Sequence, residues 1–338
     1  MNDSLTRTVE ALPAASTETM ISVRGLKVEF PLINGPPVVA LQSLDFDIER
    51  GEIFGLVGES GAGKTTLARS LLRLPPEPGR ITSGQILFEG RDILAMDQEA
   101  LRRLRGRRMS MIVPNPRGEL NPLQPIGAQI ATMARVHLGA DRDNARQMAL
   151  KMLRAVQIPD PERRMRAFAH ELSGGMAQRV VIAIALVCSP SFIVSDDATS
   201  GLDVTVQAQI LDLLRRLARE RGSSMLFITR DMGITAHFCD RIAVMYRGEI
   251  VEIADREDFF FRPRHPYTIM LMAAFSYNQK LRRIWSQRES ATLATTSIDG
   301  CAYIGRCPLA QKRCQTQHPQ LTEIAPGHHV RCHFPIAR

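Results

Sequence analysis

The sequence predicts an α/β fold in which helices cover a mainly parallel sheet. Three short apolar stretches are typical of buried strands: residues 52–58, 191–197 and 224–229. A long amphipathic stretch, residues 204–221, separates the last two and is predicted to be a helix. Strand–helix–strand connections of this length favour parallel pairing.

The remaining elements follow from their own patterns. "ISVRGLKVEF" (21–30) and "LQSLDFDI" (41–48) alternate in part between apolar and polar residues, and the turn-rich "INGPPV" separates them. "GQILFEGRDI" (84–93) predicts a further sheet segment. Residues 120–188 show a helical pattern, and residues 241–254 predict two strands around Arg247 and Gly248.

Composition limits the class of protein. Of the 338 residues, 44% are hydrophobic, which is ample for a core. The longest apolar run, "VVIAIALVC" (180–188), falls well short of the roughly 18 residues that cross a bilayer. Residues 1–20 are polar, lack the apolar stretch of a signal peptide and predict a flexible arm. These features favour a cytosolic protein.

The net charge of +8 admits nucleic acid, an anionic membrane surface or phosphorylated ligands as partners. Five arginines lie within "LRRLRGRR" (101–108). No pattern of base-stacking aromatics accompanies them, and aromatic residues make up only 5% of the chain. We therefore interpret this run as a solvated helix face and expect no nucleic-acid partner.

A phosphate-binding loop follows the first of the buried strands. "GESGAGKTT" (58–66) places Gly58, Gly63, Lys64 and Thr65 in register with the phosphate-loop pattern of P-loop NTPases. Its glycines let backbone N–H groups converge on phosphate oxygens, Lys64 is expected to reach the β and γ phosphates, and Thr65 is expected to bind Mg²⁺. The predicted ATP-binding residues of the loop are Gly58, Glu59, Ser60, Gly61, Ala62, Gly63, Lys64, Thr65 and Thr66.

A second motif, "ELSGGMAQR" (171–179), narrows the class. By itself, it could be a helix start with Ser173 as the N-cap. Together with the phosphate loop it resembles the signature sequence of ABC ATPases. The resemblance implies a P-loop NTPase fold with a mainly parallel sheet core, an antiparallel β subdomain and an α-helical subdomain. The resemblance implies that Leu172, Ser173, Gly174, Gly175 and Met176 act in trans, on ATP held by an opposite subunit. It also implies that Asp196, in "FIVSDD", stands on the Mg²⁺ side and that Asp203, in "SGLD", lies in the D-loop at the dimer interface.

The resemblance is closer to the ATPase subunits of oligopeptide, dipeptide and nickel importers, and runs from about residue 21 to the C-terminus. It is carried by "LDVTVQAQI" (202–210), "DRIAVMYRGEIVE" (240–252) and "HPYTIMLMAA" (265–274). It implies a peripheral subunit on the cytoplasmic face of the inner membrane. The implied partners are a second ABC ATPase subunit with a competent site, two transmembrane permease subunits and an extracytoplasmic solute-binding protein. The substrate pocket belongs to other subunits, so peptides, nickel chelates, opines and small glycosides stay open.

The C-terminal residues are rich in cysteine. Four of the six cysteines lie in the last 38 residues: Cys301, Cys307, Cys314 and Cys332. Four thiolates can hold a [4Fe–4S] cluster or a structural Zn²⁺, and the gaps between these four are wider than those of usual zinc knuckles. The resemblance also implies iron–sulfur, with zinc as the alternative. Cys188 and Cys239 stand in apolar segments and are expected in the core.

The site departs from the family pattern at three hydrolytic positions. Asp197 stands where a glutamate is usual, Pro114 where a glutamine is usual and Arg230 where a histidine is usual. Asp197 is one methylene shorter, which moves its carboxylate by about 1.5 Å, and a misplacement near 1 Å can cost about 100-fold in rate. Pro114 has no amide side chain, and Arg230 cannot accept a hydrogen bond, although Arg230 could simply pair with Asp231. The pattern predicts a site that binds Mg·ATP and hydrolyses it weakly.

The expected organisation is an arm (1–20), an ABC ATPase domain (21–275) with a helical subdomain at about 115–185, a linker (276–300) and a Cys-rich region (301–338). A rival reading is a soluble ABC protein that acts on nucleic acid or the ribosome. Such proteins usually carry two cassettes or long coiled-coil insertions, and this chain shows one cassette and no such insertion. A third reading is a regulatory paralogue that binds ATP without transport.

Overall fold

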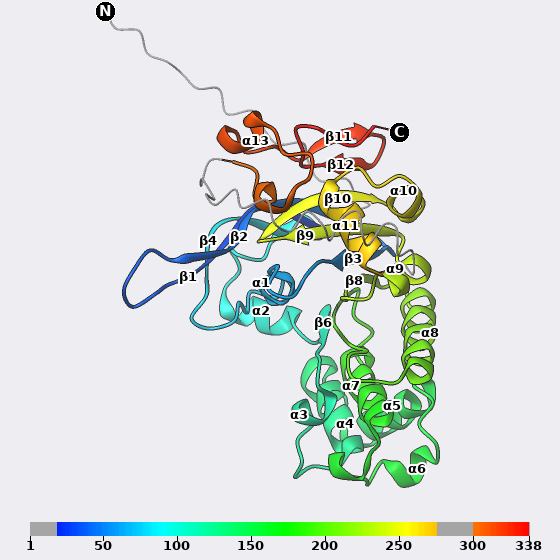
Figure 1. The fold of residues 1–338 in the computed structure, drawn as a ribbon. Helices are drawn as coiled ribbons and strands as arrows, with labels where there is room; N and C mark the ends of the chain where they lie inside the picture. The colour runs from blue at the N-terminus through cyan, green and yellow to red at the C-terminus, as the bar shows by residue number, and fades with distance from the viewer. Residues whose placement is uncertain (1–18, 276–299, 338) are drawn as a thin grey trace, which may run out of the picture.

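The computed structural model describes residues 19–275 and 300–337. Thr19 and Met20 belong to the first strand, so the predicted arm is two residues shorter than expected; the rest of that arm, and all but the last residue of the predicted linker, lie outside the described residues. Within these residues, two sheets form the upper part of the molecule, and a group of helices projects below them (Figure 1).

The larger sheet has eight strands in the order β11-β12-β10-β9-β3-β8-β7-β6. Pairing is parallel from β9 through β6, and antiparallel among β9, β10, β12 and β11. Its strands are β3 (Ile53–Val57), β6 (Met109–Ile112), β7 (Phe192–Asp196), β8 (Ser224–Ile228), β9 (Arg241–Tyr246), β10 (Glu249–Asp255), β11 (Thr322–Ala325) and β12 (His328–Val330).

The parallel core of this sheet confirms the predicted α/β fold. The three stretches predicted as buried strands are β3, β7 and β8, and every residue in each is buried. Strands covered on both faces read as continuous apolar runs, which explains why they stood out in the sequence. Strands β6, β11 and β12 were not predicted. The last two add the Cys-rich region to the same sheet, because β12 pairs with β10 and β11 pairs with β12.

The smaller sheet is antiparallel, with the order β2-β1-β4-β5. Its strands are β1 (Thr19–Phe30), β2 (Val38–Glu49), β4 (Arg80–Phe88) and β5 (Arg91–Asp92). The break at residues 31–37 joins β1 to β2 as predicted. This hairpin projects from the body of the molecule in Figure 1, on the same side as α1 (Lys64–Ser70) and α2 (Gln98–Leu104).

The helical lobe lies between β6 and β7 in the sequence, and all of it except its first helix falls within the stretch (120–188) that showed a helical pattern. It comprises α3 (Pro116–Glu119), α4 (Ile126–Leu138), α5 (Arg142–Ala155), α6 (Pro161–Arg164), the short 3₁₀ helix η1 (Ala169–Glu171) and α7 (Gly174–Leu186). Local signals set its boundaries. The Asp141 side chain caps α5 by accepting from Asn144 N, and Gly139, at φ 67°, ends α4 in a left-handed conformation.

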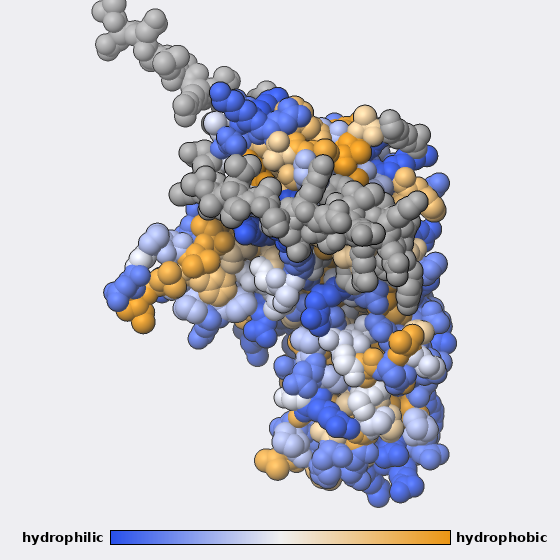
Figure 2. All heavy atoms as spheres, in the orientation of Figure 1, coloured by the Kyte–Doolittle hydropathy of each residue, from blue (hydrophilic) through white to orange (hydrophobic). Residues whose placement is uncertain are grey.

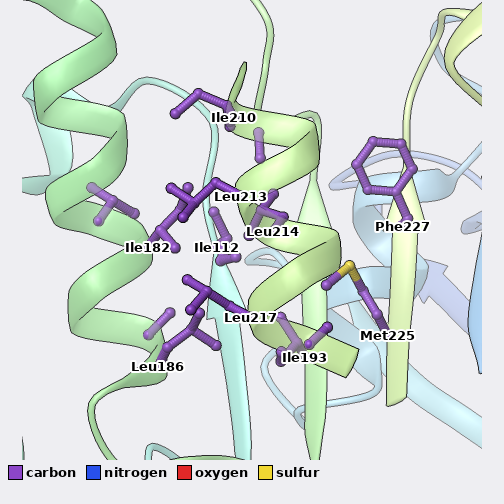
Figure 3. Close-up of a cluster of buried hydrophobic side chains, with 14 of the residues drawn as sticks. Ile112, Ile182, Leu186, Ile193, Ile210, Leu213, Leu214, Leu217, Met225 and Phe227 are labelled. Carbon is purple, nitrogen blue, oxygen red and sulfur yellow. The ribbon is translucent and has the colours of Figure 1, made fainter. Parts of the chain in front are cut away.

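Helix α8 (Val204–Glu220) packs the lobe against the sheet. Its buried side chains Ile210, Leu213, Leu214 and Leu217 recur at helical spacing, so they form one apolar face. Figure 3 shows this face between α7 and the strands, with Ile182 and Leu186 on one side and Ile193, Met225 and Phe227 on the other. Each such leucine or isoleucine contributes roughly 1.5–3 kcal/mol by burial.

The remaining elements follow β8 in the sequence. They are α9 (Met232–Phe238), α10 (Arg256–Phe261), α11 (Pro266–Phe275), the 3₁₀ helix η2 (Ile304–Arg306) and α13 (Lys312–Thr316). Cys188 and Cys239 are buried in the core, as predicted. No helix among the described residues is both long and apolar enough to cross a membrane.

Candidate functional site

The predicted ATP site lies at one edge of the larger sheet. Strands β3, β8 and β7 are neighbours and run parallel, so their carboxyl ends meet at this edge. The phosphate loop follows β3, Asp197 follows β7, and Arg230 stands two residues after β8. Ligands of open α/β sheets commonly bind at the carboxyl ends of the strands.

A cavity of about 610 Å³ opens at this edge. Nine of the predicted site residues line it: Ser60, Gly61, Gly63, Lys64, Thr65, Thr66, Asp196, Asp197 and Arg230. The other lining residues are Val38, Val39, Ala40, Ile228, Thr229, Arg247 and Gly248.

Two glycines of the phosphate loop are required by close approach as well as by conformation. Gly58 has φ 154°, and a Cβ there would lie 2.2 Å from the carbonyl oxygen of Met245. Gly63 has φ 103°, and a Cβ there would lie 2.8 Å from the carbonyl oxygen of Ala40. The loop is therefore held against β2 and β9 at contact distance, which fixes its path between β3 and α1.

Lys64 is buried inside this loop. Its Nζ donates to the carbonyl oxygens of Gly58 (2.7 Å) and Glu59 (2.8 Å). Burial lowers the pKa of Lys64, and the nearby carboxylates of Asp197 and Asp196 act in the opposite direction. The Lys64 ammonium thus donates to two backbone carbonyl groups beside the cavity. Phosphate oxygens bound in the cavity could replace these carbonyl oxygens as its acceptors.

Asp196 and Thr65 come together as the sequence predicted for a Mg²⁺ site. Burial raises the pKa of Asp196, and a hydrogen bond with the Thr65 side chain opposes that shift. Asp196 Oδ2 is buried and has no hydrogen-bond partner among the described residues. A buried carboxylate oxygen without a partner, beside a hydroxyl, suits a hard cation such as Mg²⁺. These residues therefore fit the predicted metal.

Arg230 pairs with Asp197 across the mouth of the cavity. Arg230 Nη2 lies 3.1 Å from Asp197 Oδ2 and 3.3 Å from Ser200 Oγ. The alternative partner, Asp231, instead caps α9 by accepting hydrogen bonds from Gly233 N and Ile234 N. Asp197 has φ 47°, a left-handed conformation that is uncommon outside glycine. Two of the three unusual hydrolytic residues thus engage each other.

Pro114 is placed differently. It follows β6, at the far side of β7 from the phosphate loop, and is exposed. It does not line the cavity that the described residues form. Asn115, the next residue, has φ 60° and begins α3. Pro114 therefore stands where the chain leaves the sheet for the helical lobe.

The signature residues lie away from this cavity, at the start of α7. Ser173 is the N-cap, and its Oγ accepts from Met176 N at 3.3 Å. A Cβ on Gly175 would lie 2.7 Å from Val206 Cγ1, so this glycine allows α7 to approach α8. Asp203 caps α8 by accepting from Val206 N. None of Leu172, Ser173, Gly174, Gly175 or Met176 lines the described cavity, so within one chain the signature and the phosphate loop are separate.

The aliphatic wall of the cavity was not predicted from the sequence. Val38 and Val39 line it and are more than one third exposed, next to Leu32 and Ile33 at the end of the β1–β2 hairpin. Figure 2 shows orange, hydrophobic surface gathered on this projecting hairpin. The signal available in the sequence was "PPVVA" (36–40), an apolar run directly after a turn.

The four clustered cysteines line one small, mainly apolar cavity, together with Tyr303, Ile304, Leu309 and Phe334 among others. The backbone also joins them, since Cys301 N donates to the carbonyl oxygen of Cys314 at 2.8 Å. Burial raises the pKa of Cys301 to about 11 and that of Cys307 to about 12. All six cysteines of the chain are free thiols. No group of three or more His, Cys, Asp or Glu side chains in the described ranges is arranged to hold a metal ion.

The chain is similar to known proteins in sequence and in fold. The ABC transporter family model matches residues 41–200, and a model of the oligopeptide/dipeptide transporter C-terminal region matches residues 251–314. A probable peptide ABC transporter ATP-binding protein of Sinorhizobium fredii is 40% identical, over 93% of this chain and 95% of its own length. The dipeptide transport ATP-binding protein DppD of Bacillus subtilis is 38% identical, over 93% of this chain and 94% of its own. The dimeric ATP-binding cassette MJ0796, solved with ADP and Pi, has a TM-score of 0.63 at 24% identity, over 70% of this chain and 99% of that one, and supports the fold.

Proposed function

The chain is an ABC-type ATPase, a member of the ABC transporter family and of its peptide and dipeptide ATP-binding proteins, and we propose that it energises the import of peptides or a related small solute. The observation that carries the proposal is the pairing of two features in one chain. The residues proposed to hold Mg·ATP line one cavity at the phosphate loop, and residues 251–314 match the C-terminal region of oligopeptide/dipeptide transporters.

The proposed complex contains three further kinds of protein. The chain pairs with a second, catalytically competent ABC ATPase subunit, and the pair drives two transmembrane permease subunits fed by an extracytoplasmic solute-binding protein. The chain itself lies on the cytoplasmic face of the membrane. The names of its relatives, which refer to peptide and dipeptide transport, support a role in transport. We propose that nucleic acid is not a partner.

At its own site the chain is proposed to bind Mg·ATP and hydrolyse it slowly. Lys64 exchanges its two carbonyl partners for phosphate oxygens, and Thr65 and Asp196 hold Mg²⁺. The Asp197 carboxylate already accepts a hydrogen bond from Arg230, so one of its oxygens is not free to accept from an attacking water. The arginine side chain carries donors and no acceptor, so Arg230 can donate to the γ phosphate but cannot accept a hydrogen bond.

The separation of the signature from the phosphate loop supports a composite arrangement. A nucleotide held by the phosphate loop of one subunit would be completed by the signature of the other. Ser173 and Gly175 of this chain would then serve the partner's ATP, while Asp197 and Arg230 serve its own. The chain would thus contribute the hydrogen-bond donors of its signature to the ATP site on the partner's phosphate loop.

We propose four segments for the chain: an N-terminal arm (1–20, less its strand residues), an ABC ATPase domain (21–275) with a helical subdomain (about 115–185), a linker (276–300) and a Cys-rich region (301–338). For the last of these we propose a structural [4Fe–4S] cluster, with zinc as the alternative. The shared lining of one apolar cavity by Cys301, Cys307, Cys314 and Cys332 supports the donor set. The thiols must lose their protons on binding, and their positions must adjust, because no ready metal group exists among the described residues.

Affinity purification of the tagged chain from its native membranes tests the function. Co-isolation of two integral membrane proteins and a second ATP-binding protein supports the importer. Recovery of ribosomes or RNA instead would favour the soluble alternative. Recovery of the chain alone, still able to bind ATP, would favour a regulatory role.

A further inference from the structure

The phosphate loop contacts the Cys-rich region through one ion pair. Both carboxylate oxygens of Glu59 accept from Arg306: Nη1 lies 2.9 Å from Oε2, and Nη2 lies 3.0 Å from Oε1. Arg306 ends η2 and immediately precedes Cys307. The two residues are 247 positions apart in the sequence, and the fork of the guanidinium matches the carboxylate in both distances.

The backbone of Glu59 makes two more contacts that bear on the ATP site. Its N–H donates to Tyr267 Oη at 3.1 Å. Its carbonyl oxygen accepts from Lys64 Nζ at 2.8 Å. Glu59 thus contacts Lys64, which is proposed to bind phosphate, and also contacts Tyr267 and Arg306 of the C-terminal region. Any displacement of Glu59 moves one of the two carbonyl groups that hold Lys64.

A cluster of aromatic rings fixes the position from which Arg306 reaches Glu59. The rings of Tyr246, Tyr267 and Tyr303 pack at centroid separations of 4.6, 5.2 and 5.3 Å, and Tyr267 and Tyr303 are almost fully buried. Tyr303 lies three residues before Arg306, and Arg306 N donates to its carbonyl oxygen at 3.1 Å. The packed tyrosine rings therefore fix the backbone from which the Arg306 side chain reaches the phosphate loop.

The charge of Glu59 explains why the loop would need this partner. A carboxylate beside a phosphate loop repels the polyphosphate of ATP and attracts the Lys64 ammonium, whose electrostatic environment already includes Glu59. Both carboxylate oxygens of Glu59 accept from Arg306, which balances their charge, and Lys64 donates to the backbone carbonyl of Glu59. Without Arg306, the carboxylate becomes a competitor with phosphate for the same lysine.

We propose that Arg306 is a positioning residue for ATP binding: it withholds the Glu59 carboxylate from Lys64 and so keeps the phosphate loop receptive to ATP. The inference rests on the proposed binding of Mg·ATP by this loop and is independent of hydrolysis and transport. It also makes the segment between Cys301 and Cys307 a part of the nucleotide site, through one side chain.

The test is the equilibrium affinity of the purified full-length chain for Mg·ATP, measured by isothermal titration calorimetry at low ionic strength. Arg306→Met keeps most of the apolar stem and removes the charge, and it is expected to weaken binding by about two- to fivefold, as fits a half-exposed ion pair. In a Glu59→Gln background, the same Arg306→Met change is expected to alter the affinity by less than about 1.5-fold. Arg313→Ala is the matched control and should bind as the parent does, since Arg313 lies in the neighbouring α13 and its Nε donates to Gln317, just after that helix.

Rescue by Glu59→Gln distinguishes positioning from a structural role, because a collapsed Cys-rich region would not recover when Glu59 loses its charge. The proposal is overturned if Arg306→Met binds ATP as tightly as the parent, or if it weakens binding equally in both backgrounds. Should Arg306→Met fail to fold, Arg306→Lys supplies the same comparison with a smaller expected change. If the parent chain itself binds no ATP, the proposed function fails, and this outcome is distinct from a parent that binds while all variants bind alike.

Discussion

Arg230 Nη2 lies 3.1 Å from Asp197 Oδ2, at the carboxyl ends of two neighbouring parallel strands. The pair joins two of the three residues that replace the usual hydrolytic set. An Asp197 oxygen that already accepts from a guanidinium is not free to accept from an attacking water. The pairing supports the proposal that this site binds nucleotide and hydrolyses it slowly.

The first prediction concerns turnover by the purified chain without its partner. It should bind Mg·ATP and hydrolyse it only very slowly, because neither Asp197 nor Arg230 can serve as a well-placed base. Single-turnover hydrolysis of radiolabelled ATP measures this directly. Brisk hydrolysis that Asp197→Asn abolishes would show that the paired carboxylate is an effective base after all.

The second prediction concerns Lys64. Replacing it with alanine should weaken Mg·ATP binding by about 10- to 100-fold, which is the range expected for one charge-assisted hydrogen bond to phosphate. Lys27→Ala is the matched control, since Lys27 pairs with Glu29 on the surface of β1. Equal affinities for the two variants, measured by calorimetry, would mean that Lys64 stays on the carbonyl groups of Gly58 and Glu59 when nucleotide binds.

The third prediction concerns the geometry of the phosphate loop. Gly58→Ala should lower the free energy of unfolding by about 2–5 kcal/mol, because its Cβ combines a backbone clash with strained φ. Gly51→Ala, where φ is 70° and no atom lies within 4 Å of the added Cβ, should cost only about 1–2 kcal/mol. Urea unfolding of both variants checks the difference. Equal losses would show that the contact with Met245 relaxes at little cost.

The fourth prediction concerns the four clustered cysteines. The full-length chain purified without oxygen should be brown and contain about four irons. Cys307→Ser should reduce the iron content, while Cys188→Ser, in the core of the helical lobe, should not. Metal analysis by mass spectrometry decides the matter: one zinc per chain in a colourless protein, or no metal in either variant, contradicts the cluster.

The sequence predicted the sheet more completely than the contacts within the site. Strands β3, β7 and β8 were identifiable because burial on both faces leaves continuous apolar runs, and the phosphate loop was identifiable because its spacing is fixed by chemistry. By contrast, β6 is only four residues long and follows an arginine-rich helix, so no pattern marks it. Strands β11 and β12 are short and partly polar and depend on β10 for their pairing.

Side-chain partners that are distant in sequence could not be predicted. Arg230 has Asp231 as its neighbour in the chain, yet its partner is Asp197, because the neighbouring strands β7 and β8 bring their carboxyl ends together and Asp231 is engaged by α9. Arg306 likewise reaches Glu59 only because the aromatic cluster holds η2 against the phosphate loop. Nothing in the local sequence of either arginine specifies the choice.

In the proposed complex, this chain completes its partner's catalytic site while its own site turns over little. The most direct measurement is the steady-state ATPase of the reconstituted importer with changes confined to this chain. Ser173→Ala and Gly175→Asp should each reduce the rate, by about 10²- to 10³-fold if one preorganised donor to the γ phosphate is lost. Asp197→Asn should leave the rate within about twofold, since its site is proposed to contribute little turnover. If Asp197→Asn reduces the rate as severely as the signature variants do, this chain's own site is catalytic and the account is wrong.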